Sequence, residues 1–229
     1  MEKRLTFQLR ARFAWWQMLN ERIWKSPPRG ANPYITHLPV LFTLRRFRRF
    51  RRVLELGCGE GSTLAFLDRS CFPEVERLVS YENDLVWAER VEEMAHGDRR
   101  LCMKVRSGSM AKAVAEEELG DYDLVFIDDS RTIAERSETI STIAARRPQT
   151  AVVVIHDFEI LEYRYAALAF KHRCRITGLS PNVGVLWNRG GVARQPLRTL
   201  NHALHNLPTT SYPSDRRGWL AWVEEHVGQ

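Results

Sequence analysis

The middle of the chain alternates between short apolar runs and helix-like stretches, and this alternation limits the folds open to it. The apolar runs predict β-strands at 53–57, 77–82, 101–106, 122–128 and 151–156. The stretches between them predict helices at about 62–70, 84–95, 109–118 and 132–146. Strands that alternate with helices favour a parallel sheet covered on both faces, joined by right-handed crossovers. The sequence therefore predicts a Rossmann-like, doubly wound α/β fold.

Two further strand-like runs, "CRITGLS" (174–180) and "NVGVLWN" (182–188), follow without a helix between them. The Pro-Asn turn that joins them predicts a hairpin, which places an antiparallel strand at one edge of a mostly parallel, seven-stranded sheet. We divide the chain into an N-terminal helical extension (1–33), an α/β domain (34–189) and a C-terminal tail (190–229). The tail is expected to carry a short helix from Asp215 to His226.

The N-terminal extension has apolar residues at helical spacing, which predicts an amphipathic helix over 3–25. Three aromatic residues lie off its apolar stripe: Phe7, Trp15 and Trp24. They either pack on the rest of the domain or form a homodimer face or a cover over the active site. No apolar run approaches the roughly 20 residues that span a bilayer, and the cysteines lack CxxC spacing. We therefore expect a cytoplasmic protein with reduced thiols and no membrane segment.

The net charge of +6 is concentrated in one short run. Residues 45–52, "RRFRRFRR", hold six arginines and no acid, and the remaining 28 Lys and Arg are balanced by 28 Asp and Glu. The run precedes the first strand, so it lies one strand length, roughly 17 Å, from the loop at the far end of that strand. A solvated basic face is one interpretation, and a contact with a partner or polyanion is the alternative.

The stretch "VLELGCGEGSTLAFL" (53–67) places Gly57, Gly59 and Gly61 directly after the first strand. Open α/β sheets bind ligands at this position, and glycines let a group approach the backbone closely. A dinucleotide fingerprint would have glycine or alanine where this chain has Ser62. Glu55, two residues before the turn, would repel a pyrophosphate and suit a cationic amino-acid ligand. These features favour S-adenosylmethionine over a nicotinamide cofactor.

The motif "ELGCGEG" resembles the first motif of class I S-adenosylmethionine-dependent methyltransferases, and the resemblance extends over about 34–188. It implies that the acid closing the second strand, Glu82, binds the ribose hydroxyls. The segment "RSGSM" places Ser109 and Met110 where relatives contact adenine, with Met110 or Tyr81 packing on the base. The implied cofactor-binding residues are Glu55, Gly57, Gly59, Gly61, Tyr81, Glu82, Ser109, Met110 and Asp128.

The stretch "DLVFIDDSR" resembles the strand-end motif of catechol and caffeoyl-coenzyme-A O-methyltransferases, in which an aspartate binds magnesium and a lysine three positions later acts as base. Asp128 matches the metal-binding position. Arg131 replaces the lysine and stays protonated near neutral pH, so it does not accept a proton. "VIHDFE" places His156 and Asp157 on the paired metal positions in altered order. The resemblance therefore implies Mg²⁺ or another divalent cation on Asp128, His156 and Asp157.

The alternative for these three residues is a catalytic pair without a metal, in which His156 is a general base and an aspartate orients it. A helix from Tyr34 to Arg46 would place Tyr34, Thr36 and His37 beside the cofactor, as lid or substrate contacts together with Arg131. The resulting hypothesis is methyl transfer to an oxygen, or else a nitrogen, of a small molecule. Three alternatives stay open: an RNA methyltransferase that uses 45–52, a non-catalytic cofactor-binding scaffold and an NAD-dependent oxidoreductase.

Overall fold

The computed structural model describes residues 32–129, 132–190, 192–208 and 211–227. The expected N-terminal helix over 3–25 and Arg131 lie outside the described residues. The homodimer and cover hypotheses for that helix therefore stay predictions.

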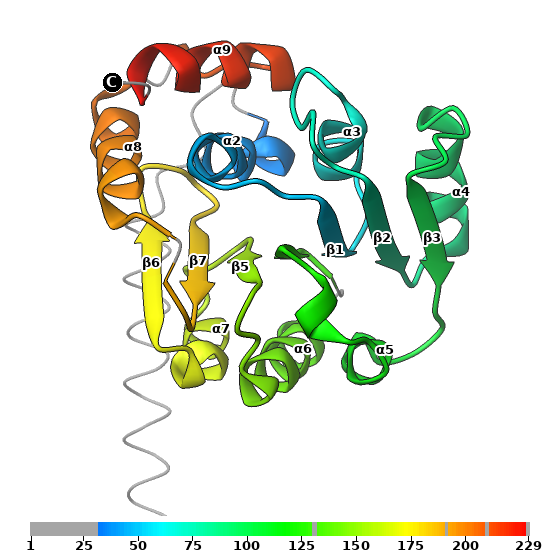
Figure 1. Ribbon diagram of the computed structural model, residues 1–229. Helices are drawn as coiled ribbons and strands as arrows, with labels where there is room; N and C mark the ends of the chain where they lie inside the picture. Colours follow the sequence, from blue (N-terminus) through cyan, green and yellow to red (C-terminus); the bar gives the residue numbers. More distant parts are fainter. Residues whose placement is uncertain (1–31, 130–131, 191, 209–210, 228–229) are drawn as a thin grey trace, which may run out of the picture.

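The described residues form a seven-stranded sheet in the order β3-β2-β1-β4-β5-β7-β6 (Figure 1). Strands β1 to β5 are parallel, and β7 is antiparallel to both β5 and β6. This confirms the mostly parallel sheet and the hairpin. The antiparallel strand lies one place in from the edge, because β7 pairs with β5 on one side and with its hairpin partner β6 on the other. The strands are β1 (Arg52–Leu56), β2 (Arg77–Glu82), β3 (Leu101–Val105), β4 (Leu124–Ile127), β5 (Val152–Ile155), β6 (His172–Ile176) and β7 (Val183–Trp187).

Helices cover both faces of the sheet (Figure 1). Residues of α2, α3, α8 and α9 join one apolar cluster with the sheet, and residues of α5, α6 and α7 join a second cluster on the other face. Within the described residues, every helix is too short or too polar to cross a bilayer. The helices are α2 (Leu38–Phe47), α3 (Ser62–Leu67), α4 (Leu85–Met94), α5 (Met110–Ala115), α6 (Ile133–Arg146), α7 (Leu161–Ala166), α8 (Arg194–Asn206) and α9 (Arg216–His226).

The central strands are apolar throughout because both of their faces are covered. In β4, Leu124 and Phe126 belong to the α2 side of the sheet, whereas Val125 and Ile127 belong to the α6 side. β1 and β5 follow the same two-residue period. A residue two positions along a strand therefore faces the same layer, which fixes the direction of the polar side chains at the strand ends.

The C-terminal tail completes one face of the sheet. Helix α9 confirms the short helix expected at Asp215–His226, and the Asp215 side chain caps it by accepting a hydrogen bond from the Gly218 backbone N–H at 2.8 Å. Helix α8 was not predicted, although Leu197, Leu200 and Leu204 have helical spacing and are buried. Both helices pack against α2.

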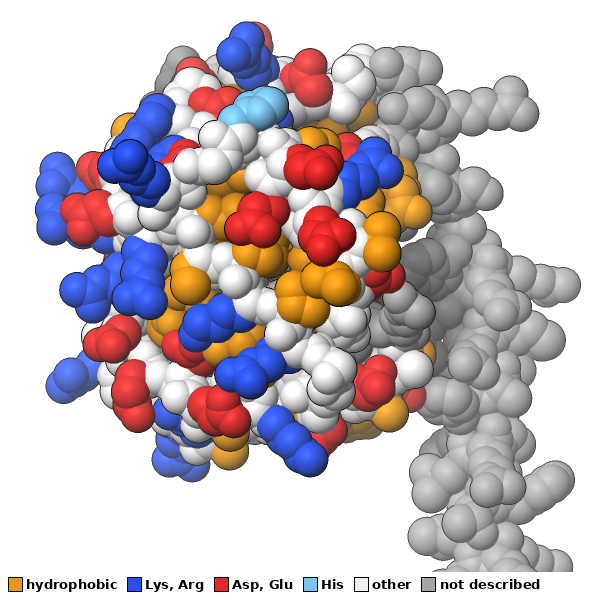
Figure 2. All heavy atoms as spheres, turned by 90° about the vertical axis from the view of Figure 1, so that its right-hand side faces the viewer, with side chains coloured by type: hydrophobic (Ala, Val, Ile, Leu, Met, Phe, Trp, Pro, Cys, Tyr) orange, Lys and Arg blue, Asp and Glu red, His pale blue; other side chains and the backbone are white. Residues whose placement is uncertain are grey.

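The arginine run of 45–52 lies around the end of α2 and the start of β1, at the amino end of the strand. Four of its arginines contact acids from neighbouring segments at 3.1 to 3.9 Å. The pairs are Arg45 with Glu224, Arg49 with Glu74, Arg51 with Glu76 and Arg52 with Asp121. Acidic and basic side chains are also interspersed over the face toward the β3 edge (Figure 2). These local pairs offset the charge of the run, which favours the interpretation as a solvated face.

Candidate active site

A cleft of about 1080 Å³ lies at the carboxyl ends of β1, β4 and β5. Cofactor and substrate sites of α/β sheets occur at this edge, and the volume suits a ligand of cofactor size. Segments that are far apart in the sequence meet here: the glycine turn after β1, the residues before α2, the ends of β4 and β5 and the start of α9. The lining includes 32–35, His37, Leu38, 57–62, Trp87, Arg90, Asp128, Arg136, His156, Asp157, Pro181 and 214–217.

The glycine turn brings backbone segments of the protein into close contact. Gly57 has a φ of +86°, and a Cβ atom there would lie 2.4 Å from the carbonyl oxygen of Asp128. A Cβ on Gly61 would lie 3.0 Å from the carbonyl oxygen of Tyr34. At Gly59 the nearest atom would be the Ser62 hydroxyl at 3.7 Å, an ordinary contact. Two of the three glycines are therefore required by packing between chain segments, and Gly59 has space beside the cleft.

Glu55 lies beneath this turn and outside the cleft lining. Its carboxylate is buried and accepts hydrogen bonds from the Thr63 hydroxyl at 2.7 Å and the Ser80 hydroxyl at 2.6 Å. The Thr63 hydroxyl in turn accepts one from the Gly59 N–H at 3.0 Å. This corrects the expectation that Glu55 faces the ligand, because the two-residue period of β1 directs it toward the same layer as Val53. Glu55 instead supports the glycine turn through Thr63.

Replacing Glu55 by glutamine is expected to remove a pH-dependent loss of stability. Burial raises the pKa of Glu55 from 4.5 to about 7, against hydrogen bonds from Ser62, Ser80 and Thr63 that lower it. Because the folded state holds this proton more tightly, the stabilising contribution is complete below pH 4.5 and is lost as pH rises through 7. From pH 4.5 to 8, the free energy of unfolding should fall by roughly 3 kcal/mol more in the wild type than in Glu55→Gln. Urea unfolding measures this difference, and parallel pH profiles for the two proteins would contradict it.

Glu82 lies at the end of β2 beside the glycine turn. One carboxylate oxygen accepts the backbone N–H groups of Asn83 at 2.7 Å and Asp84 at 3.0 Å. The other accepts the Cys58 N–H at 3.2 Å and contacts its thiol at 3.6 Å. The thiol contact is weak, so a hydroxyl group of a ligand could take its place and donate a hydrogen bond to this carboxylate oxygen. Glu82 thus joins the glycine turn to the end of β2.

Three residues expected at the adenine ring lie outside the cleft lining. Tyr81 alternates with Glu82 on β2, so its side chain enters the opposite apolar cluster, where its hydroxyl accepts a hydrogen bond from the Lys104 amine at 3.0 Å. Met110 is buried in the same cluster. The exposed Ser109 hydroxyl donates to Glu138 at 3.4 Å. The aromatic side chain that lines the cleft near the end of β2 is Trp87 of α4, and Tyr81 does not line it.

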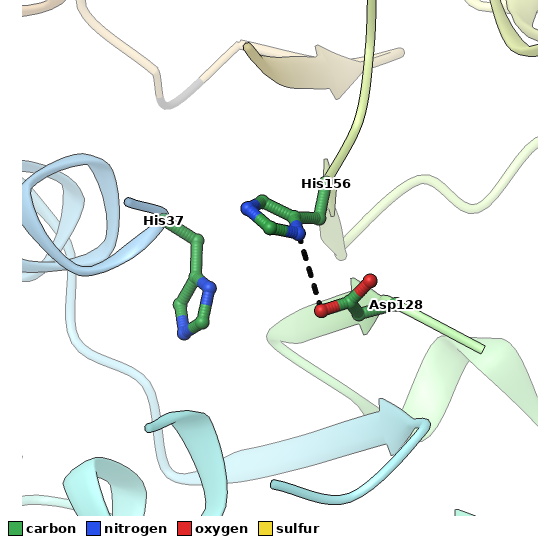
Figure 3. Close-up of side chains that lie close together, drawn as sticks. All are labelled: His37, Asp128 and His156. Atoms are coloured by element: carbon green, nitrogen blue, oxygen red, sulfur yellow. Dashed lines mark ion pairs between the residues drawn. The ribbon is translucent and has the colours of Figure 1, made fainter. Parts of the chain in front are cut away.

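Asp128 and His156 form a pair at the ends of β4 and β5, in which His156 is buried and Asp128 is partly exposed (Figure 3). His156 Nδ1 lies 3.2 Å from Asp128 Oδ2, and its Nε2 lies 2.8 Å from the Thr36 hydroxyl. Burial acts to lower the pKa of His156, but the Asp128 carboxylate outweighs burial and raises it. Burial acts to raise the pKa of Asp128, but His156 and Arg136 hold it below its usual value. A proton shared by the pair therefore rests on the imidazole, and Thr36 fixes the ring.

His37 presents a second imidazole beside the first. It is buried in the cleft wall, and neither ring nitrogen has a hydrogen-bond partner among the described residues. Its ring meets His156 edge-on with 5.2 Å between the ring centroids. Burial, and next the charge of His156, lower the pKa of His37 to about 3. Two neighbouring histidines thus have pKa values displaced in opposite directions, which is typical of acid–base sites.

Asp128 and Asp157 of the predicted divalent-ion site both contact an arginine. Arg136 from α6 places its guanidinium between the two carboxylates, with Nη2 3.1 Å from Asp128 Oδ1 and Nη1 2.8 Å from Asp157 Oδ2. Asp157 Oδ1 lies 3.8 Å from His156 Nδ1. The carboxylate oxygens that would bind an ion instead contact an arginine. These contacts disfavour the metal assignment that the sequence resemblance implied, and that assignment stays a prediction.

Another set of donor atoms, on His37, Asp128 and His156, lies within 4.8 Å of one another (Figure 3). Two imidazoles and one carboxylate suit a transition-metal ion better than Mg²⁺. An ion there would have to replace the hydrogen bond between Asp128 and His156, and it would lie beside the Arg136 guanidinium.

No family model matches the chain, and no curated protein matches its sequence. A methyltransferase from Geobacter sulfurreducens has a TM-score of 0.52 and 15% identity, over 76% of this chain and 87% of that chain. A spermidine synthase in complex with the transition state analogue AdoDATO has a TM-score of 0.54 and 15% identity, over 85% and 75% of the two chains. The spermidine synthase from Thermotoga maritima has a TM-score of 0.50 and 17% identity, over 85% and 72%. The fold is the class I methyltransferase fold. Identities this low establish the fold and no activity.

Several cleft residues of this class I fold had no sequence signal. Arg136 lies within an ordinary amphipathic helix, and Trp87 and Arg90 lie on the first turns of α4, where the guanidinium packs over the indole at 5.4 Å. Residues 214–217 reach the cleft from the C-terminal tail. Of the expected lid residues, Tyr34 is 79% exposed at the rim, whereas Thr36 and His37 are buried.

Proposed function

We propose that the protein is an S-adenosylmethionine-dependent methyltransferase that methylates an oxygen of a small molecule. The observation that carries this proposal is the Asp128–His156 pair, which lines the cleft beside the glycine turn. The class I fold and the motif "ELGCGEG" at that turn support S-adenosylmethionine as the cofactor.

The chain's own residues would remove the acceptor's proton. Bound S-adenosylmethionine supplies an electrophilic methyl group on a positively charged sulfur. The Asp128 side chain is 28% exposed in the cleft, and His156, at 5%, lies behind it. Asp128 therefore accepts the hydrogen bond of the acceptor hydroxyl, and the proton passes through the Asp128 carboxylate to Nδ1 of His156. A positive charge bound in the cleft lowers the pKa of His156, which favours the neutral imidazole that accepts a proton.

His37 and Tyr34 would contact the acceptor. The unpartnered ring nitrogens of His37 offer one donor and one acceptor at physiological pH, because its lowered pKa keeps the ring neutral. Tyr34 stands at the rim and would cover a bound molecule. The remaining lid prediction, Arg131, lies outside the described residues.

The test combines cofactor binding with turnover. Calorimetric titrations compare S-adenosylmethionine, S-adenosylhomocysteine and NADH. The protein is then incubated with methyl-labelled S-adenosylmethionine and a panel of phenols, alcohols, carboxylates, amines and RNA. Labelled product from a hydroxyl compound is the expected result. Binding of NADH alone would identify an oxidoreductase, and binding of the sulfonium cofactor without turnover on any acceptor would favour a scaffold.

Replacing Glu82 by alanine should weaken the binding of S-adenosylhomocysteine by at least about 30-fold, because charged hydrogen bonds to ribose and to the glycine turn are lost together. Isothermal titration calorimetry measures the affinity. Glu89→Ala is the matched control, because Glu89 is exposed on α4, whereas Glu82 is buried against the glycine turn. Equal affinities for the two variants would exclude Glu82 from the cofactor site.

A further inference from the structure

Arg136 lies where the sequence resemblance implied a metal ion. Its guanidinium bridges Asp128 and Asp157, and its Nε–H also donates to the Asp129 carbonyl oxygen. The side chain is 8% exposed and packs against the Tyr163 ring at 5.4 Å. A cation is therefore already bound between the two strand-end carboxylates, and the chain itself supplies it.

The guanidinium meets the same requirement that a divalent ion would meet. Asp128 and Asp157 follow adjacent strands, so their carboxylates lie near one another and repel unless a positive charge stands between them. Asp157 has a φ of +55°, a sparsely populated conformation for a residue other than glycine, and its carboxylate contacts Arg136. The planar, permanently charged group binds both carboxylates without giving up a proton.

We propose that Arg136 replaces the divalent ion and positions Asp128 in a metal-independent active site. Arg136 binds Asp128 through Oδ1, which leaves Oδ2 toward His156. An added divalent ion would lie beside a fixed positive charge and would compete for carboxylate oxygens that already have partners. Arg136 is therefore a positioning residue that acts through Asp128.

The proposal shares the Asp128–His156 pair with the proposed function, but it can fail separately because its test measures ion binding. Mn²⁺ is the probe, and electron paramagnetic resonance reports its bound fraction. The wild type is expected to bind no ion in the cleft. Arg136→Ala should bind one Mn²⁺ at least about tenfold more tightly, because a repelling charge is removed and two carboxylates become free. Mn²⁺ should also raise the melting temperature of this variant alone.

Three further variants test whether the gain in Mn²⁺ binding arises from the charge of Arg136 and from the carboxylates that it contacts. Arg136→Lys keeps the positive charge and should stay free of Mn²⁺. Arg90→Ala removes another arginine of the cleft lining, one that pairs with the exposed Glu60, and should behave as the wild type. Adding Asp157→Asn to Arg136→Ala should abolish the new ion site.

Two results would overturn the proposal. One is Mn²⁺ binding by the wild type that is lost in His37→Ala, which would place an ion on His37, Asp128 and His156. The other is a folded Arg136→Ala variant that binds no more Mn²⁺ than the wild type. If Arg136→Ala does not fold because Asp128 and Asp157 lose their shared arginine, the wild type and Arg136→Lys still decide. Mn²⁺ bound by either of them in the cleft contradicts the proposal.

Discussion

Replacing Gly57 by alanine is expected to lower the free energy of unfolding by at least about 3 kcal/mol, because two independent costs coincide. The φ of +86° is strained for any residue with a Cβ atom, and that atom would lie 2.4 Å from the Asp128 carbonyl oxygen. The clash involves backbone on both sides, so no side-chain rotation relieves it. Urea unfolding measures the loss.

Gly59→Ala is the matched control for this prediction. It changes the same turn, but the new Cβ would meet only the Ser62 hydroxyl at 3.7 Å. It should change the free energy of unfolding by less than about 1 kcal/mol, because Gly59 has no backbone strain that alanine would meet. Similar losses for the two variants would show that the contact between β1 and β4 does not depend on Gly57.

Replacing His156 by alanine should lower kcat for methyl transfer by about 1000-fold, the range expected when a general base is removed. The affinity for S-adenosylhomocysteine should change by less than about threefold, since this residue acts on the acceptor. In the wild type, kcat should rise with pH through the pKa of His156, because only the neutral imidazole accepts a proton. This dependence should disappear in His156→Ala.

His202→Ala serves as the control for the histidine prediction. His202 is exposed on α8, outside the cleft lining, and its removal should leave both kcat and the pH profile unchanged. Turnover by His156→Ala within about threefold of the wild type would assign proton removal to another group and would leave His156 a structural role.

The strand ends explain which parts of the site could be predicted from sequence. The apolar runs ending at Asp128 and His156 are adjacent in a parallel sheet, so their carboxyl ends meet at one edge and bring the two residues together. The motif around Gly57 marks the same edge. These predictions succeeded because strand period, strand direction and turn chemistry are local properties of the chain.

Side-chain direction and long-range partners could not be predicted in this way. The sequence placed Glu55 toward the ligand, but the layer that covers its face of β1 buries it against Thr63 and Ser80. Thr36 contacts His156 across 120 residues of chain, and this contact depends on how the segment before α2 lies against the end of β5.

The sequence by itself determined the α/β class, the hairpin, the glycine turn and the common sheet edge at which Asp128 and His156 lie. Only the tertiary structure decided that an arginine stands where a metal ion was expected. Arg136 lies on α6, an amphipathic helix whose sequence pattern does not indicate a functional site. The rotation of α6 about its axis directs the Arg136 side chain between Asp128 and Asp157. The packing of whole layers sets that rotation, so no short stretch of sequence contains it.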